Sequence, residues 1–280
     1  METETRQSAA EGPVMPWTPA RAARLAVGGR GRFALALALT VGLLAGATAY
    51  VARVAWFPAL EEAIAALPDR ARIDDGWLIW PNADRMVLAD NQWLALVVDP
   101  VARDPSVQAA DVQIELTANA CWISCLPGCL RLPYPPGYVI DLDRDTVESL
   151  WGAWRPWVQA GVFFAGGLLP AALAALIALL LAGPAKGYAW LLGRPAGWGA
   201  AWRLAFAAQI PGAWLLTLGL ILYRFRALMP PLLLGVLALG GLVTGGFLLL
   251  APWWLPRPET ETAPPPSRDN PFADAESGEE

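Results

Sequence analysis

FALALALTVGLLAGATAYVARV, residues 33–54, decides the fold class that the sequence predicts. The run is apolar throughout except for Arg53 near its end. A helix needs about 20 residues to cross the hydrocarbon core of a bilayer, because each residue adds only about 1.5 Å. The stretch therefore predicts a transmembrane helix, which we place at residues 33–56.

Three further apolar runs are long enough to cross a bilayer. They lie at about 157–181, 205–223 and 228–250, and none of them contains a charged residue. Four such runs are typical of membrane spans and not of core helices in a soluble protein. The predicted fold class is an α-helical polytopic membrane protein with four transmembrane helices, and with a small α+β extracytoplasmic domain inserted between helices 1 and 2.

Charge divides the chain into five parts. Residues 1–32 form a basic cytoplasmic segment, expected to be largely disordered, and 33–56 form the first span. Residues 57–150 hold most of the acidic side chains and form the extracytoplasmic domain. Residues 151–254, with no acidic side chain, form a three-helix transmembrane bundle. The acidic, Pro-rich tail, 255–280, is expected to be disordered and cytoplasmic.

The basic residues near the span ends predict the orientation. Cytoplasmic flanks carry an excess of Arg and Lys. With the N-terminus inside, eight cations are cytoplasmic and four are not: Arg21, Arg24, Arg30, Arg32, Lys186, Arg194, Arg203 and Arg257 against Arg53, Arg155, Arg224 and Arg226. We therefore expect both termini in the cytoplasm and residues 57–150 outside. A competing reading makes Ala47-Thr48-Ala49 the cleavage site of a signal peptide, since small residues two apart suit the signal peptidase.

The composition excludes several kinds of chemistry. The chain has 280 residues, 56% of them hydrophobic and 16% charged, and contains no His. Without His the usual zinc sites, Ser/His or Cys/His catalysis and His-ligated haem are excluded. No enzyme activity, catalytic residue, cofactor or metal ligand is predicted. The positive charges are too scattered for a nucleic-acid surface.

The exported domain shows five strand-like segments. Each is short, rich in Val, Ile and aromatic residues, and bounded by Asp, Asn, Pro or Gly. They are GWLIWP (76–81), RMVLAD (85–90), QWLALVVD (92–99), DVQIELT (111–117) and GYVIDL (137–142). PALEEAIAALP, 58–68, predicts a short helix near the membrane. A last helix is expected to start near Asp145, with Glu148 completing a capping box.

Three cysteines, Cys121, Cys125 and Cys129, lie close together in CWISCLPGC. In an oxidising compartment they predict one disulfide with a third thiol left over, and the sequence does not say which two pair. Three reduced, buried thiols are the alternative. A metal site is disfavoured because Pro127 and Gly128 interrupt a helix and no His supplies a fourth ligand.

Side chains in and beside the spans predict how the helices pack and are anchored. Two GxxxG pairs, Gly42 with Gly46 and Gly241 with Gly245, predict close helix packing. Pro211 predicts a kink in the third span, where the amide of Gln209 can bond freed carbonyls or a neighbouring span. Tryptophans at the span ends are expected to be interfacial anchors: Trp151, Trp154, Trp157, Trp253 and Trp254.

One family resemblance rests on GWGAAWRLAFAAQIPGAWLL, 197–216, preceded by IDDGWLIWP and LALVVDP. With Gly76, Asp99, Arg203 and Pro211, this pattern resembles a family of uncharacterised bacterial four-span proteins grouped with the Yip-type membrane proteins. The resemblance covers about residues 30–255. It implies four spans with an exported domain, and no reaction or cofactor.

These observations lead to one expected function and two alternatives. We expect a non-enzymatic, multi-pass protein of the bacterial cytoplasmic (inner) membrane, whose exported domain senses, docks or scaffolds an envelope partner. Its partners would be the lipid bilayer and an envelope or membrane protein, and not nucleic acid. The first alternative is an accessory subunit or facilitator of membrane transport acting through the helix bundle. The least favoured is an envelope hydrolase that uses carboxylates.

Overall fold

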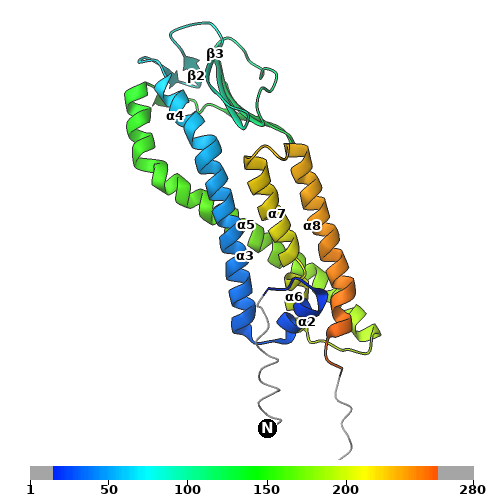
Figure 1. Ribbon diagram of the computed structural model, residues 1–280. Helices are drawn as coiled ribbons and strands as arrows, with labels where there is room; N and C mark the ends of the chain where they lie inside the picture. The colour runs from blue at the N-terminus through cyan, green and yellow to red at the C-terminus, as the bar shows by residue number, and fades with distance from the viewer. Residues whose placement is uncertain (1–14, 258–280) are drawn as a thin grey trace, which may run out of the picture.

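The computed structural model describes residues 15–257 and places two small sheets at one end of a set of long helices (Figure 1). The two ends of the described chain lie together at the opposite end (Figure 1). Part of the expected N-terminal segment, 1–14, and most of the expected acidic tail, 258–280, lie outside the described residues.

The predicted fold class is wrong. The described chain contains eight strands in two sheets, one of three and one of five strands. A five-stranded sheet beside long helices makes this a mixed α+β fold, in which the sheets are a layer of their own and not a small appendage to a helical bundle. The sequence underestimated the sheets because three of the eight strands gave no recognised signal.

The helices account for most of the length of the molecule. They are α2 Pro19–Val27, α3 Arg30–Val51, η1 Ala52–Trp56, α4 Phe57–Ala65, α5 Arg144–Leu191, α6 Trp198–Ala207, α7 Ile210–Arg224, α8 Pro230–Leu250 and η2 Ala251–Trp254. Within residues 15–257, four helical stretches are long and apolar enough to cross a membrane: Arg30–Ala65, Arg144–Leu191, Trp198–Arg224 and Pro230–Trp254. The first three of these begin earlier than the runs at 33–56, 157–181 and 205–223 that the sequence indicated.

Helix α2 lies within the segment that was expected to be largely disordered. Thr18 caps it by accepting a hydrogen bond from the Arg21 N–H at 3.3 Å, and Pro19 takes the first position, where its missing N–H costs least. Four apolar side chains of α2 are buried against the core formed by α3, α5, α6 and η2: Ala22, Ala23, Leu25 and Ala26. This burial fixes the helix against the bundle.

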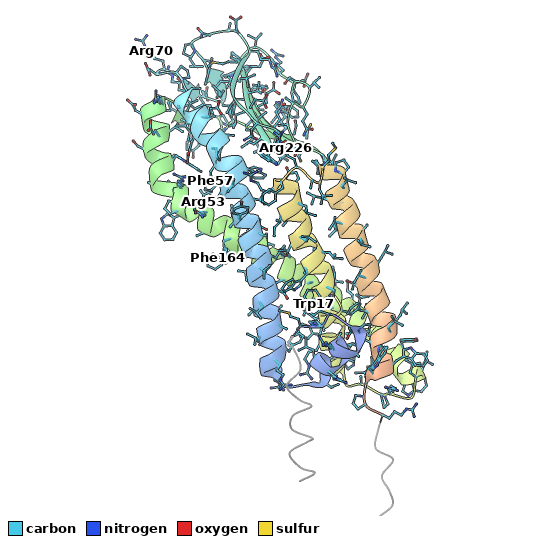
Figure 2. All side chains as sticks on the ribbon, in the orientation of Figure 1. Trp17, Arg53, Phe57, Arg70, Phe164 and Arg226 are labelled. Carbon is cyan, nitrogen blue, oxygen red and sulfur yellow. The ribbon has the colours of Figure 1, made fainter. Side chains whose placement is uncertain are left out.

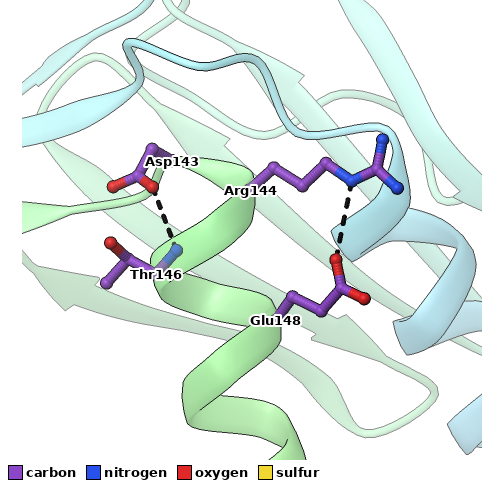
Figure 3. A network of polar contacts seen from close by, with 4 residues as sticks. All are labelled: Asp143, Arg144, Thr146 and Glu148. Carbon is purple, nitrogen blue, oxygen red and sulfur yellow. Dashed lines mark hydrogen bonds and ion pairs between the residues drawn. The ribbon is translucent and has the colours of Figure 1, made fainter.

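The N-cap of helix α5 lies two residues before the predicted one. Asp143, not Asp145, is the N-cap, and its side chain accepts a hydrogen bond from the Thr146 N–H at 3.0 Å (Figure 3). Because this bond stabilises the charged form, it lowers the pKa of the Asp143 carboxyl. Glu148 makes no capping box and instead lies 3.6 Å from Arg144 (Figure 3).

The strands form two sheets above the helices. They are β1 Arg72–Asp74, β2 Trp77–Ile79, β3 Met86–Asp90, β4 Leu94–Asp99, β5 Val112–Thr117, β6 Ala120–Cys125, β7 Gly128–Pro133 and β8 Val139–Asp141. The order is β2-β1-β8 in one sheet and β3-β4-β5-β6-β7 in the other. All pairs are antiparallel except β4 with β5.

One apolar core joins α4 to both sheets. Ala59 and Ala63 of α4 pack with Ile73 of β1 and with Leu94 and Val98 of β4. Strand β4 has a neighbour on each side and is apolar on both faces, which is the pattern of a buried strand with a parallel neighbour. The core positions the five-stranded sheet on the end of the α3–α4 helix.

A polar joint connects the five-stranded sheet to the end of α7 and the turn that follows it. The Tyr223 hydroxyl at the end of α7 donates a hydrogen bond to the Asp111 carboxylate at 2.7 Å. The guanidinium carbons of Arg224 and Arg226 lie 5.0 and 5.7 Å from the centre of the Trp93 ring. Figure 2 shows Arg226 where the sheets meet the α7–α8 turn. The sheet domain is therefore held at two places, by α4 and by this turn.

Candidate functional site

Strand β5 has one apolar and one polar face. Ile114 and Leu116 point toward the core shared with α4. Gln113, Glu115 and Thr117 alternate with them and are completely buried. Three buried polar side chains in a row need hydrogen-bond partners, because each would otherwise lose its hydration without compensation.

Glu115 holds the segment 100–111 over this polar face. Its Oε2 atom accepts hydrogen bonds from the Ser106 N–H at 2.8 Å, from the Ser106 hydroxyl at 2.9 Å and from the Gln113 amide at 3.0 Å. Gln113 in turn accepts from the Ala109 N–H at 2.8 Å. The other oxygen, Oε1, is buried and has no hydrogen-bond partner among the described residues. The same holds for the indole nitrogen of Trp122, the residue opposite Glu115 in β6.

Strand β7 is the open edge of the sheet. It pairs on one side with β6, and all six of its residues are exposed. Leu130 is 56% and Leu132 44% exposed, so the edge carries two apolar side chains. Arg131 is the cation of this strand, and its guanidinium carbon lies 5.8 Å from the centre of the Trp122 ring.

The pairing register shows which backbone groups of β7 are open. Cys125 and Gly128 close a two-residue turn, so they form a pair that exchanges both hydrogen bonds. Because bonded and non-bonded pairs alternate, Cys129, Arg131 and Pro133 direct their backbone groups away from β6. Pro133 fits this place because it has no N–H to donate. An apolar, extended edge with unused donors and acceptors can add a further strand.

The three predicted cysteines lie in the β6–β7 hairpin as free thiols. Cys121 and Cys125 share one face of β6 but are four residues apart, about 13 Å along a strand. Cys129 lies opposite Ser124, with its sulfur 3.2 Å from the Ser124 hydroxyl, so it points to the other face. A disulfide from Cys121 to either of the other two would require the backbone to move, because Cα atoms more than about 7 Å apart cannot be bridged. One between Cys125 and Cys129 would also require it, because their side chains point to opposite faces of the hairpin.

Two side chains near the hairpin have shifted acidities. Burial raises the pKa of the Cys121 thiol. Burial also raises the pKa of Tyr134, and the nearby Cys121 adds to the shift. The Tyr134 hydroxyl donates a hydrogen bond to the Thr117 carbonyl at 3.1 Å. Both groups are therefore neutral at physiological pH, and both side chains pack in the core between α4 and the sheets.

The predicted glycine pairs do not lie where helices touch. A Cβ atom added at Gly42, Gly46, Gly241 or Gly245 would meet nothing within 4 Å. Close approaches occur at other glycines. Added Cβ atoms would lie 2.7 Å from Thr48 at Gly166, 2.9 Å from Ala45 at Gly167 and 2.9 Å from the Gly240 carbonyl at Gly212. The helices α3 and α5, and α7 and α8, meet at these positions.

Gln209 lies at the break that separates α6 from α7, two residues before Pro211. Its amide donates to the carbonyl of Ala205 at 3.2 Å and to that of Ala174, in α5, at 3.0 Å. It thus satisfies a carbonyl freed by the break and also bonds a neighbouring helix. The sequence had left these two roles as alternatives.

The predicted anchor tryptophans lie at the two ends of the bundle. Trp154 and Trp157 are strongly exposed near the start of α5, on the side of the sheets. Trp253 and Trp254 are exposed in η2, at the opposite end. Trp151 differs because it packs against Phe57 of α4, with the ring centres 5.2 Å apart. Exposed tryptophans are thus present at both ends of the helices, whereas Trp151 forms a contact between α5 and α4.

The arrangement offers binding surfaces more than catalytic groups. Within residues 15–257 no three side chains that could hold a metal ion gather. The sequence did not predict three features: the exposed edge strand β7, the hydrogen bonds of Glu115 to the segment 100–111, and the contact of Trp93 with Arg224 and Arg226. The alternation of polar and apolar residues in VQIELT could have indicated the buried polar face that includes Glu115. The open edge of β7 and the contact of Trp93 with the arginines depend on how distant segments meet, which no local pattern shows.

Comparison of the chain with protein-family models, with curated proteins and with solved structures found no match. The resemblance to the Yip-type membrane proteins therefore stays a prediction, and function has to be argued from the site.

Proposed function

We propose that this chain is a non-enzymatic, multi-pass membrane protein whose sheet domain docks an extended segment of an envelope protein onto strand β7. The observation that carries the proposal is an exposed edge strand with apolar side chains and unused backbone groups. Strand addition satisfies these groups and supplies the main-chain hydrogen bonds that such a complex needs.

Four helices that are long and apolar enough to cross a membrane support the location. Eight cations belong to the end that carries the chain termini and four to the side of the sheets: Arg21, Arg24, Arg30, Arg32, Lys186, Arg194, Arg203 and Arg257 against Arg53, Arg155, Arg224 and Arg226. The excess of cations at the first end favours cytoplasmic termini and an extracytoplasmic sheet domain in a bacterial inner membrane.

The chemistry of β7 favours a partner strand over a second copy of β7. Arg131 holds a central outward position, and the antiparallel self-pairing that centres on it would place two guanidinium groups opposite each other. Like charges directly opposite destabilise a strand pair. A partner segment with an acidic residue opposite Arg131 and apolar residues opposite the leucines would avoid this repulsion.

The test uses a photoreactive amino acid at Leu130 in the full chain, expressed in its own cell envelope. We expect a crosslinked partner in the native chain, and loss of the crosslink in Arg131→Pro, which removes an outward N–H without removing a bond to β6. Arg131→Ala is the matched control, because it keeps that N–H and should retain most of the crosslink. Equal crosslinking in Arg131→Pro and the native chain would contradict docking by strand addition.

A second candidate function, accessory action in membrane transport through the helices, is favoured by one observation. A wide apolar groove separates α5 from α7 and α8. Co-purification of a membrane partner that survives deletion of residues 72–141, the region that contains all eight strands, would support this candidate over the first.

A further inference from the structure

An apolar groove of about 820 Å³ runs between α5, α7 and α8. Its walls are formed by Leu173 and Ile177 of α5, Gly212 and Leu216 of α7, and Gly241 and Leu248 of α8. Two polar side chains line it, and both donate hydrogen bonds to helix carbonyls. Gln209 donates to Ala174 and Ala205, and Thr244 donates to Gly240. The groove therefore offers dispersion contacts along its length and little hydrogen bonding.

The groove lies between helices that do not close on each other. Helix α8 packs mainly on α7, and only a small share of its apolar stretch is buried. Helix α5, with prolines at 156, 170 and 184 inside it, is close to α3 and α6. In a bilayer such a space is filled by something apolar, because an empty groove forfeits the contacts of its whole lining.

A cationic site lies above the groove, at the sheet end of α7. The guanidinium groups of Arg224 and Arg226 converge on Trp93, and the Nε atom of Arg224 is buried without a hydrogen-bond partner among the described residues. The ion pairs found in residues 15–257 do not include either arginine. The nearby carboxylate of Asp111 accepts a hydrogen bond from Tyr223. The site therefore contains two arginines outside the ion pairs found in residues 15–257, and the Nε–H of Arg224 is a donor without a partner among these residues.

The helix register places the cationic site and the groove on one face of α7. Arg224 follows the groove residue Ala213 by eleven positions. At about 100° per residue this is three turns plus about 20°, and the rise is about 16 Å. A ligand lying along this face would contact cations at one end and hydrocarbon side chains at the other.

We propose that this face binds one membrane phospholipid, with its phosphodiester on Arg224 and Arg226 and an acyl chain in the groove. The inference rests on the membrane location in the proposed function and is independent of strand docking. A helix from a second copy would fill the groove but leave the arginines without an anion. Free phosphate would pair with the arginines but leave the groove empty, so an amphiphile fits both parts.

The experiment is native mass spectrometry of the full chain in mild detergent, titrated with phosphatidylglycerol, phosphatidylcholine or a phosphate-free diacyl glycolipid. We expect one bound phospholipid and weak binding of the glycolipid. Arg224→Gln should weaken phospholipid binding about tenfold, since a charge-assisted pair is lost. Arg203→Gln, on α6 at the opposite end, is its control. Inorganic phosphate at millimolar concentration should not displace the lipid.

Groove filling gives the second readout. Gly241→Leu and Leu173→Phe fill the groove from opposite walls and should each reduce lipid retention. Gly246→Leu on the same helix does not line the groove, has open space around it and should leave retention unchanged. Equal retention in Gly241→Leu and Gly246→Leu, or equal affinity in Arg224→Gln and Arg203→Gln, would overturn the proposal. Displacement by phosphate alone would also overturn it. Because the purified protein contains no docking partner, none of these results depends on β7.

Discussion

Gln209 shows how one amide side chain joins three helical segments. It bonds α5 and the end of α6 at the place where α7 begins, so its loss leaves two carbonyls in apolar surroundings with fewer partners. We expect Gln209→Met to lower the free energy of unfolding by about 1 kcal/mol, a typical value for hydrogen bonds between membrane helices. Chemical unfolding in mild detergent measures it, with Leu218→Met, at an exposed position of α7, as the control. A change no larger than that of the control would contradict this role.

The cysteines differ in burial, and this predicts their reactivity. The thiolate is the reactive form, and burial raises the pKa of Cys121, so Cys121 carries less thiolate at a given pH. Cys129 is exposed. In chains that keep a single cysteine, maleimide should label Cys129 at pH 7.5 much faster than Cys121, whose rate should rise as the pH increases past the ordinary thiol value. Intact mass under non-reducing conditions should show three free thiols, and a loss of two hydrogens would contradict the hairpin geometry.

At the scale of elements, the contact between α7 and α8 depends on two glycines. A methyl group at Gly212 would lie 2.9 Å from the Gly240 carbonyl oxygen, a backbone atom that cannot move aside alone. We expect Gly212→Ala to destabilise the protein by about 1–3 kcal/mol through overpacking. Gly241→Ala is the matched control, because it lies next to Gly240 and meets nothing within 4 Å. Thermal unfolding in detergent compares them, and equal midpoints would show that the two helices do not touch here.

The segment 100–111 is an element without regular structure that depends on Glu115. Oε2 of Glu115 accepts three hydrogen bonds. Because a buried donor that loses its acceptor costs about 1–3 kcal/mol, Glu115→Ala should loosen this segment and lower stability by about 2 kcal/mol. Hydrogen exchange should accelerate most at the Ser106 N–H, which donates its hydrogen bond to Glu115. It should accelerate less at the Ala109 N–H, which donates to Gln113. Asp104→Ala, an exposed carboxylate of the same segment, should change neither. Unchanged exchange in Glu115→Ala would show that other contacts hold the segment.

Elements were predictable from the sequence where a local pattern decided them. The five expected strand segments each contain a strand, since runs of Val, Ile and aromatic residues ended at turn residues. Strand β1 was missed although Asp75–Gly76 carries the signal of a type I′ hairpin, with φ values of 47° and 81°. Strands β6 and β7 were not predicted because Pro127 and Gly128 were interpreted as breaks in a helix. In the structure Leu126 and Pro127 form the two-residue turn of a hairpin.

The sites were less predictable than the elements. The role of Gln209 followed from its place before Pro211, because a proline frees carbonyls close to it in the chain. The joint of Trp93 with Arg224 and Arg226, and the groove between α5 and α8, join residues that are far apart in sequence. The spacing of residues along the chain does not predict such contacts. The GxxxG pairs Gly42 with Gly46 and Gly241 with Gly245 have the expected spacing, yet none of these glycines lies where two helices touch.

At the scale of the whole molecule, the N-terminal helices belong to the folded unit. Side chains of α2 and α3 share one core with α5, α6 and η2, and Trp214 of α7 donates a hydrogen bond to the Thr40 hydroxyl of α3 at 3.2 Å. Removal of α2 and most of α3 by cleavage after Ala49 would expose this core. The packing therefore supports an uncleaved first helix over a signal peptide.

The separation of the two ends predicts the topology. Cys129 lies in the sheet domain, and Gly199 lies near the start of α6 at the opposite end, exposed and with open space around it. If the four apolar stretches cross the membrane with the termini inside, a bilayer about 30 Å thick separates these two positions. A membrane-impermeant maleimide applied to spheroplasts should label Cys129 as the single cysteine. In a chain without native cysteines, Gly199→Cys should react only after the membrane is permeabilised.

The reverse labelling pattern would place the sheet domain in the cytoplasm and remove the envelope partner from the proposed function, while the lipid site on α7 would remain testable in detergent. Labelling of both positions without permeabilisation would mean that the helices do not separate two compartments. Because Cys129 lies in β7, the same labelled chain also reports on docking. A bound partner strand should slow its modification, whereas Gly199→Cys, at the other end of the molecule, should react at the same rate with and without the partner.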